Sequence, residues 1–327
     1  MGIRQRIDAI TQLGCGSLRA APPPPKSVKI EISPRCNYLC GFCALRTREQ
    51  QPDMDMKFEL FERITGEMRE AGVEEIGLFY LGESMMNRKL LLKCLQHVKA
   101  TLNFPYVFLT SNASLAKPDF VRQLMAAGLD SLKWSVNAAD EDQFESVMGV
   151  NRKLFEVALK NIAAAYEVRE SGGYSTRLYA SSISYDGAQR EKMESLLAAR
   201  IRPFVDESYW LPLYGMAMRS EAVKAHLGYT PTHGNAGRID DATGLPNRDP
   251  LPCWSAFSEG HIRADGGMSV CCFGSDAHFD VANLNSTSFV EAWHAPKFRE
   301  IREAQLRTVT EGASALRGTM CDVCVAY

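Results

Sequence analysis

Three cysteines near the start of the chain have the spacing of metal ligands. They are Cys36, Cys40 and Cys43, and they fall within eight residues. A short loop with this spacing can wrap one [4Fe–4S] cubane, for which cysteine thiolates are the usual ligands. Three thiolates leave the fourth iron without a protein ligand, so that iron is a site for chemistry. A zinc loop would need a fourth Cys or His nearby, and none lies between Pro34 and Met56.

A second group of cysteines lies near the C-terminus. It comprises Cys253, either Cys271 or Cys272, Cys321 and Cys324, which together offer four thiolates. Four thiolates are a complete set for a [4Fe–4S] cluster, but structural zinc accepts the same set, so iron content separates the two interpretations. The chain has ten cysteines in all. Disulfide scaffolds are usually short secreted chains, which favours metal binding or catalysis here.

The composition is that of an ordinary globular protein, with 46% hydrophobic and 23% charged residues among 327. A net charge of -2 gives no basic field, so neither nucleic acid nor an anionic membrane surface is implied as a partner. The first 13 residues carry charges at Arg4, Arg6 and Asp8 and no long apolar stretch. We therefore expect no signal peptide, no spanning helix and a cytoplasmic location.

The cysteine loops need a framework, and the rest of the sequence predicts one. Residues 27–32 alternate polar and apolar side chains and run into the first cysteine loop, which indicates a strand. Helices are expected at 58–71, 90–100, 118–127, 152–170 and 189–200, and further strands at 75–81, 106–110, 131–136, 176–184 and 208–213. Parallel strands need crossover helices, so this alternation predicts an α/β fold with a partial (β/α)6 parallel barrel.

The chain divides into four expected regions. They are a leader outside the main fold at 1–25, the barrel at 26–215, an irregular linker at 216–252 and a small cysteine-bearing domain at 253–327. The proline run at 22–25 marks the end of the leader, and Gly, Pro, Asn and Asp mark the linker. Within the last region, Asp265-Gly266-Gly267 predicts a hairpin turn, and 289–304 is expected to be one helix.

The first cysteine loop resembles the radical S-adenosylmethionine (SAM) superfamily. Its CxxxCxΦC motif is met by Cys36, Cys40 and Cys43, with Phe42 as the aromatic position. The resemblance implies that the open iron binds the amino and carboxylate groups of SAM. Reductive cleavage of SAM would yield a 5′-deoxyadenosyl radical that takes a hydrogen atom from the substrate. It also implies a flavodoxin- or ferredoxin-type reductant.

Further positions of the resemblance follow the predicted strands in order. Gly82-Glu83 looks like the family's glycine and glutamate motif, which would place Glu83 on the SAM amino group. Polar residues at the carboxyl ends of strands suit ligand binding in open α/β sheets. The other residues that the resemblance brings to SAM are Ser111 or Asn112, then Ser135 and Asn137 on its ribose or carboxylate, and Arg177 on its carboxylate.

The late cysteines resemble the twitch form of the SPASM extension of radical SAM enzymes. The matching features are Asp265-Gly266, Asn283-Leu284, Glu291-Ala292-Trp293 and the terminal CxxC. This resemblance selects Cys271 over Cys272 as a ligand. One auxiliary [4Fe–4S] cluster would then be held by Cys253, Cys271, Cys321 and Cys324.

The function expected first is a radical oxidoreductase that acts on a small polar metabolite, such as an aminocyclitol or sugar alcohol. The auxiliary cluster would accept the electron when a substrate radical becomes a ketone. No peptide-recognition domain is evident in the sequence, which favours a small substrate. Candidates for the pocket, by position only, are Tyr179, Tyr185, Trp210, Tyr214, Arg219 and Arg238.

Three alternatives remain open. The first is a redox-neutral epimerase in which Cys272, or less favourably Cys94, returns a hydrogen atom to the substrate radical, although a spare buried thiol is the simpler interpretation. The second is modification of a ribosomally made peptide. The third is a cluster-bearing scaffold or redox sensor that performs no chemistry, which SAM binding and cleavage would eliminate.

Overall fold

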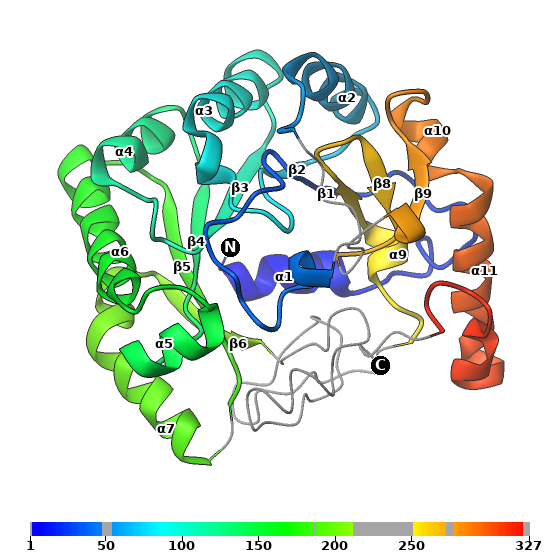
Figure 1. Ribbon diagram of the computed structural model, residues 1–327. Coiled ribbons are helices and arrows are strands. Elements are labelled where there is room, and N and C mark those ends of the chain that lie inside the picture. The colour runs from blue at the N-terminus through cyan, green and yellow to red at the C-terminus, as the bar shows by residue number, and fades with distance from the viewer. Residues whose placement is uncertain (1, 48–53, 186, 212–250, 273–276, 323–327) are drawn as a thin grey trace.

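The computed structural model describes residues 2–47, 54–185, 187–211, 251–272 and 277–322 (Figure 1). The strands form one sheet in the order β6-β5-β4-β3-β2-β1-β7-β8-β9. They are β1 (Ser27–Ile30), β2 (Glu75–Gly77), β3 (Tyr106–Ser111), β4 (Ser131–Ser135), β5 (Arg177–Ile183), β6 (Glu207–Leu211), β7 (Glu259–Ile262), β8 (Gly267–Ser269) and β9 (Asp280–Asn283). All pairs from β6 to β7 are parallel. The sheet curves into an open barrel with helices outside, which confirms the predicted partial barrel (Figure 1).

The helices of the barrel begin and end close to where the sequence predicts. They are α2 (Phe58–Glu70), α3 (Arg88–Gln96), α4 (Pro118–Ala126), α5 (Glu141–Met148), α6 (Lys153–Gly172) and α7 (Gly187–Leu196). Gly72 and Gly128, with φ of +84° and +90°, follow α2 and α4 in the left-handed conformation that terminates helices. Among the α-helices described for the barrel, α5 was not predicted. No helix in the described part of the chain is long and apolar enough to span a bilayer.

The C-terminal region continues the sheet of the barrel. Strand β7 pairs in parallel with β1, with Ser27 opposite Glu259. Strands β7 and β8 form the predicted antiparallel hairpin, and Gly266 takes a φ of +88° in its turn. The helices here are α9 (Ser255–Ser258), α10 (Phe289–Trp293) and α11 (Pro296–Glu311). The single helix expected at 289–304 is therefore wrong, because Pro296 lacks the N–H that would continue α10 and instead begins α11.

The N-terminal segment does not lie outside the fold, as we expected of a leader. Helix α1 (Ile3–Thr11) lies in the middle of the curved sheet in Figure 1. Arg6 donates from Nη1 to Glu75 Oε1 at 2.7 Å, and its guanidinium lies 3.4 Å from the centroid of the Tyr106 ring. Glu75 and Tyr106 are the first residues of β2 and β3. Helix α1 therefore covers the amino end of the barrel.

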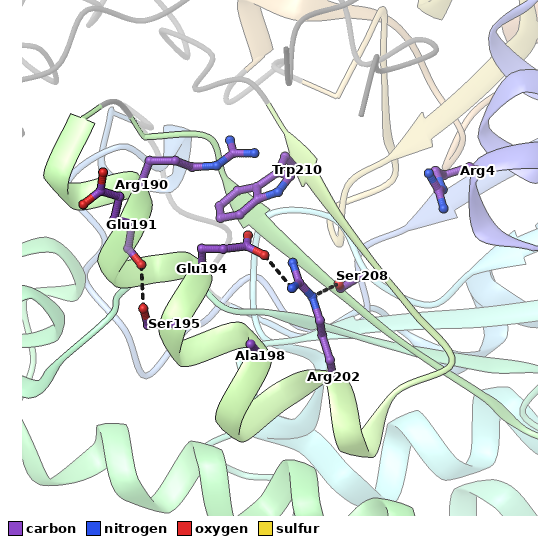
Figure 2. A pocket seen from close by; sticks show the side chains of 9 residues that line it. All are labelled: Arg4, Arg190, Glu191, Glu194, Ser195, Ala198, Arg202, Ser208 and Trp210. Atoms are coloured by element: carbon purple, nitrogen blue, oxygen red, sulfur yellow. Dashed lines mark hydrogen bonds and ion pairs between the residues drawn. The ribbon is translucent and has the colours of Figure 1, made fainter. Parts of the chain in front are cut away.

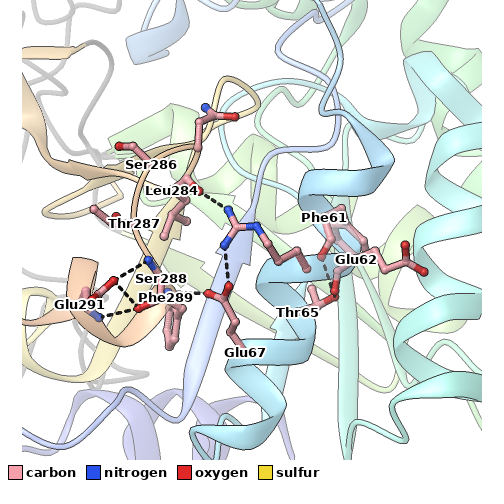
Figure 3. A network of polar contacts seen from close by, with 12 residues as sticks. Phe61, Glu62, Thr65, Glu67, Leu284, Ser286, Thr287, Ser288, Phe289 and Glu291 are labelled. Atoms are coloured by element: carbon pink, nitrogen blue, oxygen red, sulfur yellow. Dashed lines mark hydrogen bonds and ion pairs between the residues drawn. The ribbon is translucent and has the colours of Figure 1, made fainter.

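The C-terminal region is also fastened to the outside of the barrel through α2 and α10. Glu67 of α2 accepts a hydrogen bond from the backbone N–H of Phe289 at 2.6 Å, and Arg63 donates to the carbonyl oxygen of Leu284. Figure 3 shows Glu67 directed at the first turn of α10, where Ser288 and Glu291 form a capping box. The contact joins residues more than 200 positions apart in the sequence.

Candidate active site

The first cysteine loop follows β1 at the carboxyl edge of the sheet and is held by the end of α5. The N–H groups of Leu39 and Gly41 donate to the carbonyls of Met148 and Val147 at 2.9 and 3.0 Å. Gly149 follows α5 with a φ of +64°, and a Cβ there would lie 2.8 Å from the Leu39 carbonyl oxygen. Only glycine fits so close to the loop in this conformation.

The thiols of the loop fit an iron–sulfur cluster. Cys36 Sγ accepts from the N–H of Tyr38 at 3.4 Å and lies 3.9 Å from Asn112 Nδ2, and such donors favour a thiolate. Burial nevertheless raises the pKa of the Cys36 thiol to about 12, so metal binding must displace its proton. Among the described side chains, no three His, Cys, Asp or Glu residues converge as ligands of one metal ion. Three thiols on one short loop, with N–H donors directed at Cys36 Sγ, fit the ligand set of an iron–sulfur cluster.

Glu83 ties the ends of β2 and β3 together beneath this loop. Its Oε2 accepts from Ser111 Oγ at 3.0 Å and from the Asn112 N–H at 2.8 Å, and its Oε1 accepts from the Met85 N–H at 3.0 Å. Burial raises the pKa of the Glu83 carboxyl, and these three donors oppose that shift. Its oxygens are thus engaged by the protein, and its contact with SAM stays a prediction.

Gly82 explains how the Glu83 loop reaches the cysteines. A Cβ at Gly82 would lie 2.0 Å from the Ser33 carbonyl oxygen, so the two backbones touch. The N–H of Glu83 donates to the Arg35 carbonyl at 2.8 Å, directly before Cys36. Gly82 and Glu83 thus contact the backbone that leads into the cysteine loop and help to fix its position.

Asn112, which follows β3, lies close to the first cysteine of the loop. Its Nδ2 donates to Asn37 Oδ1 at 3.0 Å as well as pointing at Cys36 Sγ. Its Oδ1 accepts from Ser114 Oγ at 2.7 Å. Asn37 and Ser114 were not predicted, because their partners lie about 75 residues away in the sequence and only the folded barrel unites them.

Ser135 and Asn137, at and just after the end of β4, lie at the carboxyl edge of the sheet, whereas Arg177 does not. Ser135 ends β4, and Asn137, two residues on, accepts the Ile183 N–H on its Oδ1 at 3.0 Å. Arg177 is the first residue of β5, at the amino edge, where it lies 3.6 Å from Asp206. Six residues of parallel strand, about 20 Å, separate it from the carboxyl edge. The prediction that Arg177 meets SAM is corrected on this ground.

The late cysteines lie on three segments of the C-terminal region and are half-buried. The N–H of Cys253 donates to Gln305 Oε1 of α11 at 2.9 Å, and the N–H of Cys321 donates to Thr319 Oγ1 at 3.1 Å. The carbonyl of Cys271 accepts from the Tyr80 hydroxyl at 2.8 Å. Tyr80 follows β2, so this bond joins the late cysteines to the barrel. The fourth predicted ligand, Cys324, lies outside the described residues.

The two candidate hydrogen donors differ in position. Cys94 is fully buried on α3, in the outer layer of the barrel, and burial raises its pKa. It therefore lies on the wrong side of the sheet to meet a substrate inside the barrel. Cys272 is half-buried and close enough to Lys29 of β1 to affect that side chain electrostatically.

The predicted aromatic position of the cysteine motif, Phe42, is half-buried and packs against the core.

The pocket candidates within the described residues have different surroundings. Trp210 lines an open groove beside α7, where the Arg190 guanidinium lies 3.6 Å from its ring centroid (Figure 2). The Tyr185 hydroxyl donates to the Asn137 carbonyl, and Tyr179 is fully buried in β5. Tyr214, Arg219 and Arg238 lie outside the described residues.

Two protein-family models match the sequence. The Radical SAM superfamily model matches residues 30–179, and the SPASM model, an iron–sulfur cluster-binding domain, matches residues 253–325. The chain thus belongs to the radical SAM superfamily and carries a C-terminal SPASM domain. Its cofactors are accordingly [4Fe–4S] clusters and SAM.

Known relatives cover parts of the chain. A probable GTP 3′,8-cyclase of Thermoplasma volcanium is 30% identical over 44% of this chain and 42% of its own length. The PqqA peptide cyclase of Gluconobacter oxydans is 25% identical over 79% of this chain and 64% of its own length. The chain thus matches less than two thirds of each of these relatives.

Solved structures share the fold at low sequence identity. Streptococcus suis SuiB bound to precursor peptide SuiA superposes with a TM-score of 0.63 at 16% identity, over 86% of this chain and 67% of that one. BtrN in complex with AdoMet and 2-DOIA superposes with a TM-score of 0.53 at 13% identity, over 92% of this chain and 97% of that one.

Proposed function

We propose that this protein is a radical SAM oxidoreductase that removes hydrogen from a small polar substrate of the aminocyclitol or sugar class. The observation that carries the proposal is the contact between Cys36 and Asn112 at the carboxyl edge of the barrel. The other end of the barrel is covered by α1. Because α1 covers the amino end in the described part of the chain, we expect a substrate to enter the barrel at the cysteine edge.

The residues of the chain have separate tasks in this proposal. Cys36, Cys40 and Cys43 hold the catalytic cluster, and Asn112 and Glu83 fix the loops around it. When bound, the cluster and SAM supply hydrogen-atom abstraction from an unactivated carbon. Ser135 and Asn137 line the same edge and are proposed to contact SAM.

The late cysteines are proposed to hold an auxiliary [4Fe–4S] cluster that accepts an electron from the substrate. The Tyr80 hydroxyl bonded to the Cys271 carbonyl supports this, because it ties Cys271 to the residues after β2, and β2 pairs with β1, which leads into the first cysteine loop. Near-complete overlap with BtrN, which was solved with AdoMet and 2-DOIA, supports a substrate of that size.

The test is anaerobic reconstitution followed by reduction with dithionite in the presence of SAM, with dithionite in place of a flavodoxin- or ferredoxin-type reductant. We expect about eight irons per chain and formation of 5′-deoxyadenosine. Cys36→Ala should abolish SAM cleavage, because the cluster loses one of its three ligands. Cys321→Ala should keep cleavage but stop substrate turnover.

Cys15→Ala is the matched control, because Cys15 is exposed and belongs to neither group. It should behave like the wild type in iron content and cleavage. Zinc in place of iron, or cleavage that survives Cys36→Ala, would refute the proposed function.

A second candidate is epimerisation, and the position of Cys272 favours it. This thiol lies beside Lys29, whose side chain faces the barrel interior, so it is placed to return a hydrogen atom to a substrate radical. Replacing Cys272 by Ala would leave an oxidoreductase active and stop an epimerase. Product formed in D2O would carry solvent deuterium only in the epimerase.

A third candidate is modification of a peptide. The match to the PqqA peptide cyclase over 79% of the chain favours it, as does the fold shared with peptide-bound SuiB. Turnover of free aminocyclitols without any peptide would exclude this candidate. SAM cleavage stimulated only by a peptide encoded beside the gene would favour it.

A further inference from the structure

The interior of the barrel contains a cavity of about 210 Å³ between α1 and the cysteine edge. Inward-facing residues of β1, β2, β3, β4, β6 and β7 form its wall, and α1 forms its floor. For comparison, an apolar cavity of about 150 Å³ is enough to hold benzene. The space therefore fits one small organic group, about the size of an amino-acid side chain.

The charges that line this cavity do not balance. Arg6 pairs with Glu75 at 2.7 Å, and Lys29 pairs with Glu259 at 2.9 Å. Glu259 also accepts from His261 at 2.9 Å, so its oxygens are taken. Lys133, in the middle of β4, faces no carboxylate among the described residues that is not already paired. The cavity wall thus carries one surplus positive charge.

The other free groups of the wall can donate hydrogen bonds. The Thr110 hydroxyl and the Trp254 indole nitrogen are buried, and neither has a hydrogen-bond partner within the described part of the chain. An indole nitrogen only donates, and an ammonium group donates three times. The Tyr209 ring lies 5.9 Å from Lys133 Nζ and forms an apolar side of the space. Hydrogen-bond donors around Lys133, the one unpaired cation among the described residues of the wall, suit a ligand group that is anionic and has several acceptor atoms.

We propose that this cavity is the subsite for a carboxylate group of the substrate and that Lys133 binds that carboxylate. One surplus charge matches a carboxylate better than a phosphate, which carries about −1.5 to −2 at neutral pH. Thr110 precedes Asn112 by two residues, about 7 Å of strand, so a small acid held here extends toward the cysteine loop. The inference rests on the proposed function and narrows its substrate to a sugar acid, since an aminocyclitol carries no carboxylate.

The experiment measures binding of propionate to the reconstituted full-length protein by isothermal titration calorimetry. Propionamide is the matched uncharged probe, and inorganic phosphate tests the other anion. We expect propionate to bind about tenfold or more tightly than propionamide, and more tightly than phosphate. Lys133→Met should weaken propionate about tenfold or more, whereas Lys133→Arg should keep most of the affinity.

Lys89→Met is the control variant, because Lys89 is exposed on α3, outside the barrel. Should Lys133→Met fail to fold, Lys133→Gln gives the same comparison with a polar side chain. Equal propionate binding by wild type and Lys133→Met, no propionate binding by the wild type, or tighter binding of phosphate would each overturn the proposal. SAM cleavage is measured on the same samples, so its absence would refute the proposed function independently of the subsite.

Discussion

Lys133 shows how one side chain can carry both a stability cost and a binding role. Burial, with the nearby Lys29 cation, lowers its pKa from 10.5 to about 8. Between these two values the unfolded chain binds more protons than the folded one, so folding stability rises with pH across this window. Below pH 8 the full cost is present, since the folded protein must hold the buried charge.

Lys133→Met should therefore be more stable than the wild type at pH 7, by about 1–3 kcal/mol. The difference should shrink as pH rises from 8 to 10.5, because the wild-type lysine becomes neutral in the fold. Tyr106 and Lys29, which line the same cavity, have raised pKa values, so they do not account for the pH dependence of this difference. Urea denaturation at pH 7 and 9.5 measures the difference. A difference that does not depend on pH would contradict the argument.

At the scale of elements, the sequence predicted what local signals determine. Helix ends at Gly72 and Gly128 and the turn at Gly266 depend on neighbouring residues, and they were found. The break at Pro296 was missed because apolar spacing continues across it. Helix α1 was missed as part of the fold because its charged Arg6 pairs with a residue 69 positions away.

In the candidate site too, the residues with local sequence motifs were predicted and those placed by long-range contacts were not. The three cysteines, Glu83 and Asn112 were predicted from motifs at strand ends, and the fold brings them together. The support from α5 was not predicted, because its eight residues bury only three side chains and give a weak periodic signal. Lys133 was not predicted either, since a lysine within a short strand is normally an exposed residue.

The contact between α5 and the cysteine loop leads to a prediction about Gly149. Gly149→Ala should cost about 1–2 kcal/mol through its left-handed conformation. It should also displace Leu39 and the cysteines, so that the protein retains less iron than the wild type after gel filtration. Gly173→Ala is the control, because Gly173 has a φ of +63° with no atom near its Cβ position.

Gly173→Ala should therefore show similar destabilisation with normal iron content. If both variants lose iron equally, the effect is one of general stability and the contact with Leu39 does not matter. Iron content is measured with a chromogenic chelator, and stability by urea denaturation of the same preparations.

On the scale of the whole molecule, the cluster-binding C-terminal region is an extension of the barrel. Strand β7 is paired along β1, and α10 is fastened to α2 on the outer side (Figure 3). The segments that carry Cys36 and Cys271 thus follow two strands of one continuous sheet, β1 and β8, which fixes their spatial relation. Such long-range pairing gives no local sequence signal, so the small C-terminal domain was predicted but its attachment to β1 was not.

The bond from Phe289 to Glu67 is the part of this attachment that can be removed without touching the sheet. Glu67→Ala leaves the Phe289 N–H and Arg63 without their carboxylate partner, and should lower the free energy of unfolding by about 1–3 kcal/mol. Glu62→Ala on the same helix is the control, because the exposed Glu62 points away from α10 in Figure 3. Its stability should change by less than about 0.5 kcal/mol. Equal effects of the two variants would show that α10 is not held by this contact, and limited proteolysis of the C-terminal region should then proceed at the wild-type rate in both.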